Sequence, residues 1–261
     1  MKKAQFMTVL SINPPLSIKG GEMMLVAGYS GVGKTALVYE VHKPMTEKHG
    51  YFAAGKFDQF QRNIPYSAIS QAFNEFCQYL LTETADELIR WRDQILKAVG
   101  NNGQVLIDVI NQLELIIGPQ PLVAEVGSLD AQNRFNLVFQ NFFRAICQKE
   151  HPLVLFIDDL QWADSASLNL LKTLMTDTDS HYFQIIGAYR DNEVDEAHPL
   201  MMTLEALQKA GALLNTISLA NLSKTDVNRL ITDALKCEPL YAEPLTQLVY
   251  DKTLGNAFFY P

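Results

Sequence analysis

Four residues near the amino end of the chain have the types and spacing of a phosphate-binding loop. Gly28, Gly33, Lys34 and Thr35 fit the pattern G-x-x-x-x-G-K-[ST]. Glycines let the backbone turn tightly and bring its N–H groups onto phosphate oxygens, and the helix that follows adds its positive dipole end. We expect Lys34 to reach the β- and γ-phosphates and the Thr35 hydroxyl to ligate Mg²⁺. The residues predicted to contact the ligand are Gly28, Ser30, Gly31, Val32, Gly33, Lys34, Thr35 and Ala36.

Two acids and an arginine stand at the ends of later predicted strands. Asp158 and Asp159 follow a run of five apolar residues, and Arg190 ends the next strand candidate. Asp158 fits the Walker B role, in which it would hold Mg²⁺ together with Thr35. Asp159 is predicted to orient or deprotonate an attacking water, and Arg190 to stabilise γ-phosphate charge. With Lys34, these two residues form the predicted catalytic set.

The residues alone leave other roles open. Paired acids at the end of a strand can cap the next helix, and Arg190 can belong to a surface salt bridge. Trp162 and Asp164 follow the acids in the same turn. For them we expect a packing anchor and a helix cap rather than a role in chemistry.

Guanine recognition is not expected. The stretch Ser223-Lys224-Thr225-Asp226 has a superficial likeness to an [NT]-K-x-D box, but it begins with Ser and is typical of a helix start. In a GTPase, glycine follows the metal-binding acid three residues later. Here Gln161 and Trp162 stand three residues after Asp158 and Asp159.

The elements that must position these residues alternate between strands and helices. This alternation predicts an α/β fold, a P-loop NTPase whose parallel sheet is flanked by helices. In such sheets ligands bind beyond the carboxyl ends of the strands, so the loop, the two acids and Arg190 can converge. The predicted strands are 23–27, 51–54, 153–157, 184–189 and 216–219, and the predicted helices are 34–42, 67–81, 85–99, 105–117, 130–147, 165–175, 200–209, 224–236 and 244–252.

The helices between the second and third predicted strands indicate a helical insertion before the Walker B strand. Lys34 and Asp158 are 124 residues apart (158 − 34), which leaves room for it. Its aromatic residues recur at helical spacing and are expected to form a core stripe rather than a cofactor site. Proline is expected to end the first helix at Pro44, and the last helix is expected to cover about Pro244–Lys252.

Composition bounds the class of protein. The chain has 261 residues, 48% of them hydrophobic, and a net charge of −8, which argues against nucleic acid as the main partner. Cys77, Cys147 and Cys237 have no paired spacing, so free thiols in a reducing cytosol are expected. No apolar run is long enough to span a bilayer, and the amino end is not expected to be a signal peptide. We therefore expect a cytoplasmic protein without membrane partners.

Three blocks of the sequence together resemble a known ATPase module. They are LVAGYSGVGKTALVYEVHKP, GYFAAGKFDQFQRNIPYSAISQAF and LVLFIDDLQWAD, and GAYRDNEV also fits. The chain resembles the STAND-type, AAA-like ATPase of bacterial, cyanobacterial-type multi-sensor serine/threonine kinase–histidine kinase proteins. The resemblance implies ATP and Mg²⁺ as cofactors, slow hydrolysis, and a switch between sensing and kinase parts. It also implies kinase or sensor domains as partners, in cis or in trans.

The chain departs from this pattern at two places. The family's Gly-Arg-Glu segment is absent from residues 1–20, and Ala257 stands where the family has a proline near the base. The sequence therefore does not indicate how adenine is held. The predicted organisation is a weakly patterned segment 1–20, an ATPase core 21–220, and the start of a helical lid 221–261 that is expected to be truncated. The chain lacks the V-A-I-K, H-R-D and D-F-G motifs of a protein kinase.

Three functional hypotheses remain. The leading one is an ATP-binding, slowly hydrolysing regulatory switch. The second is an AAA-type ATPase with substantial turnover that self-associates and receives an arginine finger, for which nothing selects between Arg134 and Arg144. The third is a truncated nucleotide-binding scaffold without turnover.

Overall fold

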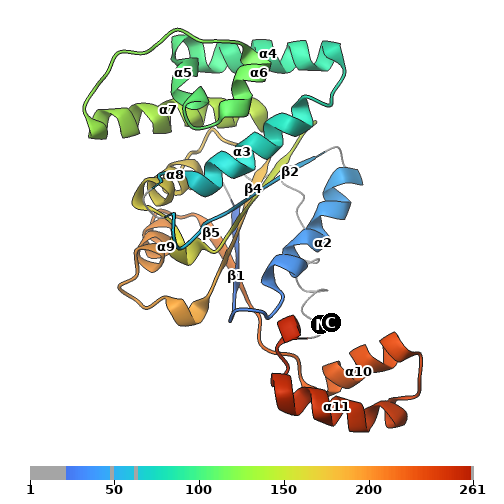
Figure 1. Ribbon diagram of the computed structural model, residues 1–261. Helices are drawn as coiled ribbons and strands as arrows, with labels where there is room; N and C mark the ends of the chain where they lie inside the picture. Colours follow the sequence, from blue (N-terminus) through green and yellow to red (C-terminus); the bar gives the residue numbers. More distant parts are fainter. Residues whose placement is uncertain (1–21, 48–49, 62–63, 260–261) are drawn as a thin grey trace.

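The computed structural model describes residues 22–47, 50–61 and 64–259. Its centre is a five-stranded sheet with the order β2-β3-β4-β1-β5, and every neighbouring pair is parallel (Figure 1). The strands are β1 (Glu22–Ala27), β2 (Tyr51–Lys56), β3 (Leu153–Asp158), β4 (Phe183–Tyr189) and β5 (Leu213–Ser218). The predicted parallel α/β sheet is confirmed.

Burial explains why these stretches form strands. Every residue of β3 and β4 is buried, as expected for strands covered on both faces. Along β1 the side chains alternate between two cores: Met23 and Leu25 enter the larger one, while Met24 and Val26 enter the smaller. The edge strand β5 is mostly exposed and starts three residues earlier than predicted.

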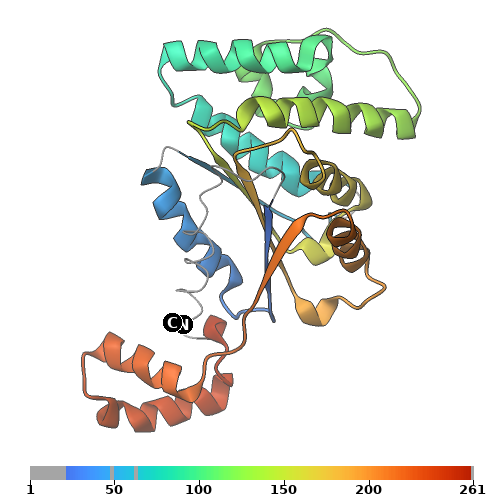
Figure 2. The same cartoon turned by 180° about the vertical axis from the view of Figure 1, so that it is seen from behind.

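Helices cover both faces of the sheet. The helix α2 (Lys34–Glu47) lies on one face, and α3 (Ser67–Leu80), α8 (Ser165–Met175) and α9 (Pro199–Lys209) lie on the other (Figure 2). The smaller core fills the space beneath α2, where Val38 is fully buried against the sheet. The glycine of β2 lets α3 approach closely, because a Cβ at Gly55 would lie 1.8 Å from the Ala68 carbonyl oxygen.

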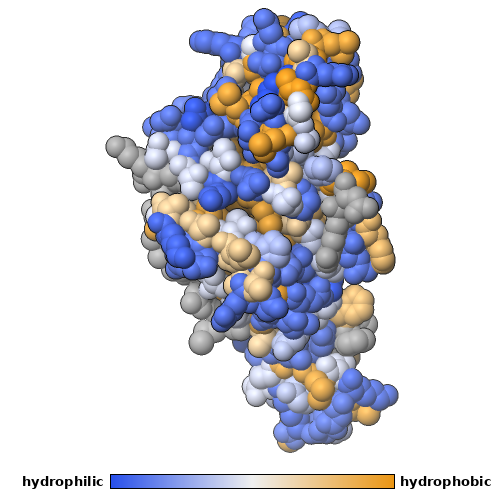
Figure 3. Space-filling model, turned by 90° about the vertical axis from the view of Figure 1, so that its left-hand side faces the viewer, coloured by the Kyte–Doolittle hydropathy of each residue, from blue (hydrophilic) through white to orange (hydrophobic). Residues whose placement is uncertain are grey.

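The predicted helical insertion is present. It comprises α4 (Ala85–Val99), α5 (Gly103–Ile107), α6 (Glu114–Ile117) and α7 (Ser128–Ile146). The aromatic residues of α7 are buried in the larger core, as the core-stripe interpretation predicts. Apolar side chains also gather on the surface over this part of the molecule (Figure 3). Those with large exposure in the insertion include Leu115, Leu122, Leu129 and Leu137.

The prediction of one continuous helix over 105–117 is wrong. The chain forms α5, a 3₁₀ turn at Asn111–Leu113, and α6 instead. Side chains of α3 replace the missing helical hydrogen bonds: Ser70 donates to the Val109 carbonyl, and Asn74 accepts from the Gln112 N–H. Tertiary contacts therefore decide the backbone here, which local periodicity does not reveal.

Two predicted helix boundaries are also wrong. The helix α2 continues past Pro44 to Glu47, and α11 (Pro239–Thr253) begins five residues before Pro244. Pro239 occupies the first turn, where its missing N–H costs nothing. Pro244 lies on the exposed side, so water can bond the carbonyl that it leaves unpaired.

The last two long helices form a pair beyond the sheet. Here α10 (Lys224–Leu235) and α11 pack through a small core of Val227, Ile231 and Ala242, and the pair stands apart from the sheet in both ribbon views (Figures 1 and 2). Ser223 and Asp226 make a reciprocal capping box, which confirms the interpretation of this stretch as a helix start. None of the helices in the described ranges is both long and apolar enough to cross a membrane.

Candidate functional site

The phosphate loop joins β1 to α2 and depends on glycine conformations. Gly31 and Gly33 have φ angles of +79° and +93°, in the region that favours glycine. A Cβ at Gly31 would also lie 2.4 Å from Asn256 Oδ1 and 2.7 Å from Phe258 Cβ. The loop is therefore shaped by its own backbone and by a close approach of the segment after α11.

Lys34 begins α2 and folds back over the loop. Its Nζ donates to the carbonyl oxygens of Gly28 at 2.8 Å and Tyr29 at 2.9 Å, and the residue is 7% exposed. Burial lowers the pKa of the Lys34 ammonium, while Asp158 and Asp159 act in the opposite direction. A cation held at this loop is suited to binding phosphate oxygens.

Thr35 and Asp158 meet although 123 positions separate them. Thr35 Oγ1 donates to Asp158 Oδ2 at 2.7 Å, and Asp158 Oδ1 accepts from the Asp159 N–H at 2.9 Å. The register of β3 against β2 and β4 brings Asp158 to the carboxyl edge of the sheet, beside the first turn of α2. A hydroxyl and a carboxylate are hard oxygen donors, so this pair fits Mg²⁺.

Both carboxylate oxygens of Asp159 are engaged by donors. Gln161 Nε2 donates to Oδ1 at 3.0 Å, Lys56 Nζ lies 3.1 Å from Oδ2, and Arg190 Nε lies 3.5 Å from Oδ1. The residue is 4% exposed and has a left-handed φ of +52°. Its side chain caps no helix. The cap of α8 is Asp164, which accepts from the Ser167 N–H at 2.9 Å, as predicted.

Arg190 lies at the carboxyl end of β4 and faces the same site. Its Nη1 pairs with Glu193 Oε1 at 2.6 Å, and its guanidinium carbon lies 4.7 Å from the centre of the Trp162 ring. Its backbone N–H donates to Gln161 Oε1 at 3.1 Å. The salt bridge anticipated as an alternative thus exists, and it leaves the guanidinium beside Asp159.

These side chains border one cavity of about 440 Å³. Among the described residues that line it, the cations Lys34, Lys56 and Arg190 outnumber the carboxylates Asp158 and Asp159. The excess of positive charge suits a phosphorylated ligand. Other lining residues come from the loop and from the segment after α11, namely Ser30, Gly31, Gly33, Thr35, Ala36, Ala257 and Phe258. Gly28 and Val32 belong to the loop but do not line this cavity.

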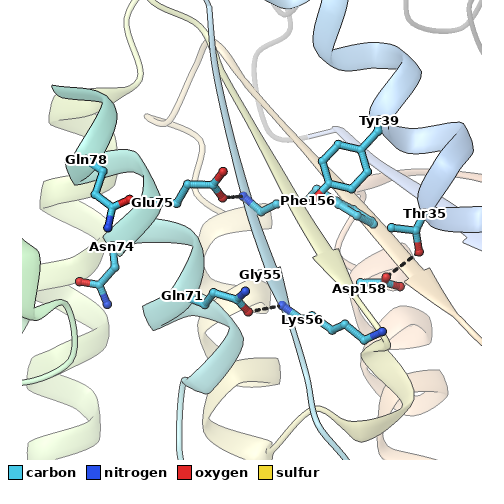
Figure 4. Close-up of a pocket in the computed structure, with 11 residues that line it drawn as sticks. Thr35, Tyr39, Gly55, Lys56, Gln71, Asn74, Glu75, Gln78, Phe156 and Asp158 are labelled. Carbon is cyan, nitrogen blue, oxygen red and sulfur yellow. Dashed lines mark hydrogen bonds between the residues drawn. The ribbon is translucent and has the colours of Figure 1, made fainter. Parts of the chain in front are cut away.

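A larger cleft of about 740 Å³ opens from the site between α2 and α3. Thr35, Lys56 and Asp158 line both spaces, and Tyr39 forms part of the α2 wall (Figure 4). The backbone N–H groups of the edge strand β2 are covered from α3: Ala54 donates to Glu75, and Lys56 donates to Gln71 (Figure 4). Such coverage protects an edge strand from pairing with another chain.

Sequence reasoning missed three residues of the site. The second predicted strand ends at residue 54, whereas β2 extends to include Lys56 and aligns it with Asp158. Gln161 joins Asp159 to Arg190, and Asn256 Nδ2 donates to the Ser30 carbonyl at 2.9 Å. Extending the second strand by two residues would have placed Lys56 at the sheet edge. The candidate arginine fingers lie on α7, where Arg134 bonds the Ala124 carbonyl and Arg144 bonds Asp177.

Comparison with known proteins shows which family this chain belongs to. A sequence model of the AAA ATPase domain matches residues 4–186, well over half of the chain. The chain belongs to the AAA ATPase domain family. Its fold also resembles that of Cdc6p from Pyrobaculum aerophilum, with a TM-score of 0.55, 13% identity, and coverage of 98% of this chain and 57% of that chain. At this identity the likeness concerns the fold alone, and it confirms the P-loop NTPase architecture.

Two curated relatives are histidine kinases. The chain is 30% identical over 321 residues to Hybrid signal transduction histidine kinase G of Dictyostelium discoideum, covering 99% of this chain and 9% of that protein. It is 22% identical over 171 residues to Histidine protein kinase 1 of Candida albicans, covering 59% of this chain and 7% of that protein. The chain thus spans less than a tenth of the length of these relatives.

Proposed function

We propose that this chain is an ATP-binding, slowly hydrolysing regulatory switch module of a signal-transduction protein. The observation that carries the proposal is that the segment after α11 lines the same cavity as Lys34, Asp158 and Arg190. A nucleotide in this cavity would therefore touch both the sheet and the segment that follows the C-terminal helix pair. A ligand that contacts two parts of a molecule can favour one arrangement of them over another.

Different groups of the chain would bind the phosphates, the metal ion and the attacking water. The backbone of residues 28–36 would cradle the phosphates, and Lys34 would bind their terminal oxygens. Thr35 and Asp158 would hold Mg²⁺, which neutralises phosphate charge when it is bound. Arg190 would stabilise charge on the γ-phosphate, and Asp159 would orient the attacking water.

We attribute slow hydrolysis to the surroundings of Asp159. Its two oxygens already accept from Gln161 and Lys56, so these donors compete with an attacking water for the carboxylate. This arrangement favours a switch over an ATPase with fast turnover. Arg144, one of the two candidate arginine fingers, is bound to Asp177 of its own chain, which further weakens that second hypothesis.

The finer context is part of the proposal. We assign the chain to the STAND-type group of signalling ATPases because its sequence blocks resemble that group and two curated relatives are histidine kinases. In this assignment, residues 21–220 form the ATPase core and 221–261 belong to a helical lid. Kinase or sensor domains would respond to the lid in cis or in trans, in the cytoplasm.

Isothermal titration with ATP and Mg²⁺ tests the proposal. We expect saturable binding below millimolar ATP, and loss of binding in Lys34→Ala. Steady-state phosphate release separates the alternatives: slow release independent of protein concentration supports the switch, and fast, concentration-dependent turnover supports a self-associating ATPase. Absence of binding at millimolar ATP contradicts the proposal. The nucleotide-binding scaffold without turnover predicts instead that Lys34→Ala changes neither nucleotide binding nor the melting temperature in excess ATP.

A further inference from the structure

Arg190 is held between two short 3₁₀ turns. The first, Leu160–Trp162, follows the two acids, and the second, Asp191–Glu193, follows β4. Gln161 of the first turn accepts from the Arg190 N–H, and the Glu193 N–H of the second turn donates to the Arg190 carbonyl at 3.1 Å. Each turn therefore bonds the backbone of Arg190, and each also brings one side chain to its guanidinium.

These two side chains, Trp162 and Glu193, contact different parts of the guanidinium. Its carbon lies over the Trp162 ring, 4.7 Å from the ring centre, whereas Glu193 Oε1 lies 2.6 Å from Nη1. Asp159 Oδ1 lies 3.5 Å from Nε. In the part of the chain that the structure describes, no residue makes a hydrogen bond to Nη2. The guanidinium is thus stacked on one aromatic ring and keeps one nitrogen for a further partner.

Stacking on Trp162 leaves the hydrogen-bonding edge of the guanidinium free. A cation–π contact uses the face of this planar group, while its N–H groups lie in the plane. The ring therefore does not compete with a phosphate for Arg190, unlike the carboxylates of Asp159 and Glu193. Arg190 lines the phosphate cavity and its side chain is 24% exposed, so Nη2 is available to a ligand there.

Trp162 itself stands outside the phosphate cavity. It lines a separate cavity of about 480 Å³ that the loop 57–61 borders, and it packs against the larger core. The packing anchor that the sequence predicts is thus present, and its ring has a second contact with Arg190. Any effect of this ring on a ligand in the phosphate cavity must pass through Arg190.

We propose that Trp162 is a positioning residue that holds the Arg190 guanidinium ready for the γ-phosphate and so favours ATP over ADP. This inference rests on the proposed ATP binding and deepens it. Without the ring, the guanidinium would be free to turn toward the neighbouring acids, and ATP would have to order it again on binding. ADP lacks the γ-phosphate, so its affinity should not depend on Trp162.

Titrations with ATP and with ADP in Mg²⁺ test this role in Trp162→Leu and Trp162→Phe. Leucine keeps apolar bulk without an aromatic face, and we expect it to lower ATP affinity about fivefold with little change for ADP. Phenylalanine has a weaker aromatic face and should restore part of the preference for ATP. Trp91→Phe, at the buried second tryptophan of the chain, is the matched control and should leave the ratio of the two affinities unchanged.

A double-mutant cycle with Arg190→Met separates positioning from packing. Arg190→Met should by itself weaken ATP binding more than ADP binding. Adding Trp162→Leu should then leave the ratio of the two affinities unchanged, because the partner of the ring is gone. A second loss of the same size in the Arg190→Met background would mean that Trp162 acts by packing alone, and it would overturn the inference.

Three other results also overturn the inference: an equal loss for ATP and ADP in Trp162→Leu, no loss for either nucleotide, or an unchanged ratio in Arg190→Met. If melting curves show that Trp162→Leu does not fold, Trp162→Phe and its cycle with Arg190→Met decide by the same criteria. Failure of the unmodified chain to bind either nucleotide contradicts the proposed function itself, which distinguishes the two failures.

Discussion

The side-chain amide of Asn256 donates a hydrogen bond of 2.9 Å to the backbone carbonyl of Ser30, 226 positions earlier in the chain. The same side chain accepts from the Phe258 N–H at 3.0 Å, which fixes its orientation. The backbone nearby is also joined, because the Leu222 N–H donates to the Gly255 carbonyl at 2.8 Å. The segment that follows α11 therefore attaches the helix pair α10–α11 to the phosphate loop.

The first prediction concerns this attachment. Asn256→Asp keeps an acceptor for the Phe258 N–H but removes the donor to Ser30, so it should loosen α10–α11 while leaving the turn intact. A hydrogen bond of this kind contributes about 1 kcal/mol to stability, so we expect the free energy of local opening of the helix pair to fall by about that amount. Hydrogen exchange of α10 and α11 measures it. Asn169→Asp on the exposed side of α8 is the control, and equal protection in the two variants would contradict the prediction.

The second prediction separates two causes of glycine dependence in the loop. Alanine at Gly33 meets no atom within 4 Å and should cost only backbone strain, about 1–3 kcal/mol. Alanine at Gly31 carries similar strain and also collides with Asn256 and Phe258. We expect Gly31→Ala to release α10–α11 in hydrogen exchange and Gly33→Ala to leave it protected. Release in both variants would show that strain alone displaces the helix pair.

The third prediction addresses the magnesium pair. Thr35→Val removes the hydroxyl that bonds Asp158 and is expected to ligate Mg²⁺, whereas Thr35→Ser keeps it. With ATP present, Mg²⁺ should raise the melting temperature of the unmodified protein and of Thr35→Ser but not that of Thr35→Val. A scan with ATP and EDTA gives the baseline for each variant. A full Mg²⁺ effect in Thr35→Val would remove Thr35 from the metal site.

The sequence predicted the sheet and the position of the site because both depend on local signals. An apolar run followed by Asp158 marks a buried strand ending at the ligand edge, and Gly33-Lys34-Thr35 marks the loop. The convergence of the loop, the acids and Arg190 then follows from parallel topology alone. The AAA ATPase domain match agrees with this result.

The missed features depend on contacts between distant segments. The break in the helix near Ile110 is made by Ser70 and Asn74 of α3, which no local pattern contains. Asn256 reaches Ser30 only because the chain returns to the loop after α11. Lys56 was missed for a local reason: glycine usually ends a strand, but Gly55 serves close packing with α3 and the strand continues.

The final prediction is a pH dependence in the core, away from the nucleotide. Arg144 Nε and Nη2 donate to the two oxygens of Asp177 at 2.7 Å and 2.5 Å, and Ser180 also donates to this carboxylate. Burial by itself would raise the pKa of Asp177, but these hydrogen bonds outweigh it and lower the pKa to about 2. A carboxyl whose pKa is depressed on folding adds stability above its unfolded pKa, and that stability is lost as the pH falls through the folded pKa.

Arg144→Met should therefore lower the free energy of unfolding by about 2 kcal/mol at pH 7, because it leaves the Asp177 charge without its partner. The difference from the unmodified protein should shrink as the pH falls from about 4 to about 2, where Asp177 becomes protonated. Urea unfolding at a series of pH values measures it. The control is Arg90→Met, which breaks an exposed pair with Glu87 and should change stability by less than about 0.5 kcal/mol at every pH. A difference for Arg144→Met that stays constant down to pH 2 would mean that packing of the arginine stem, and not its charge, holds α7 against the turn after α8.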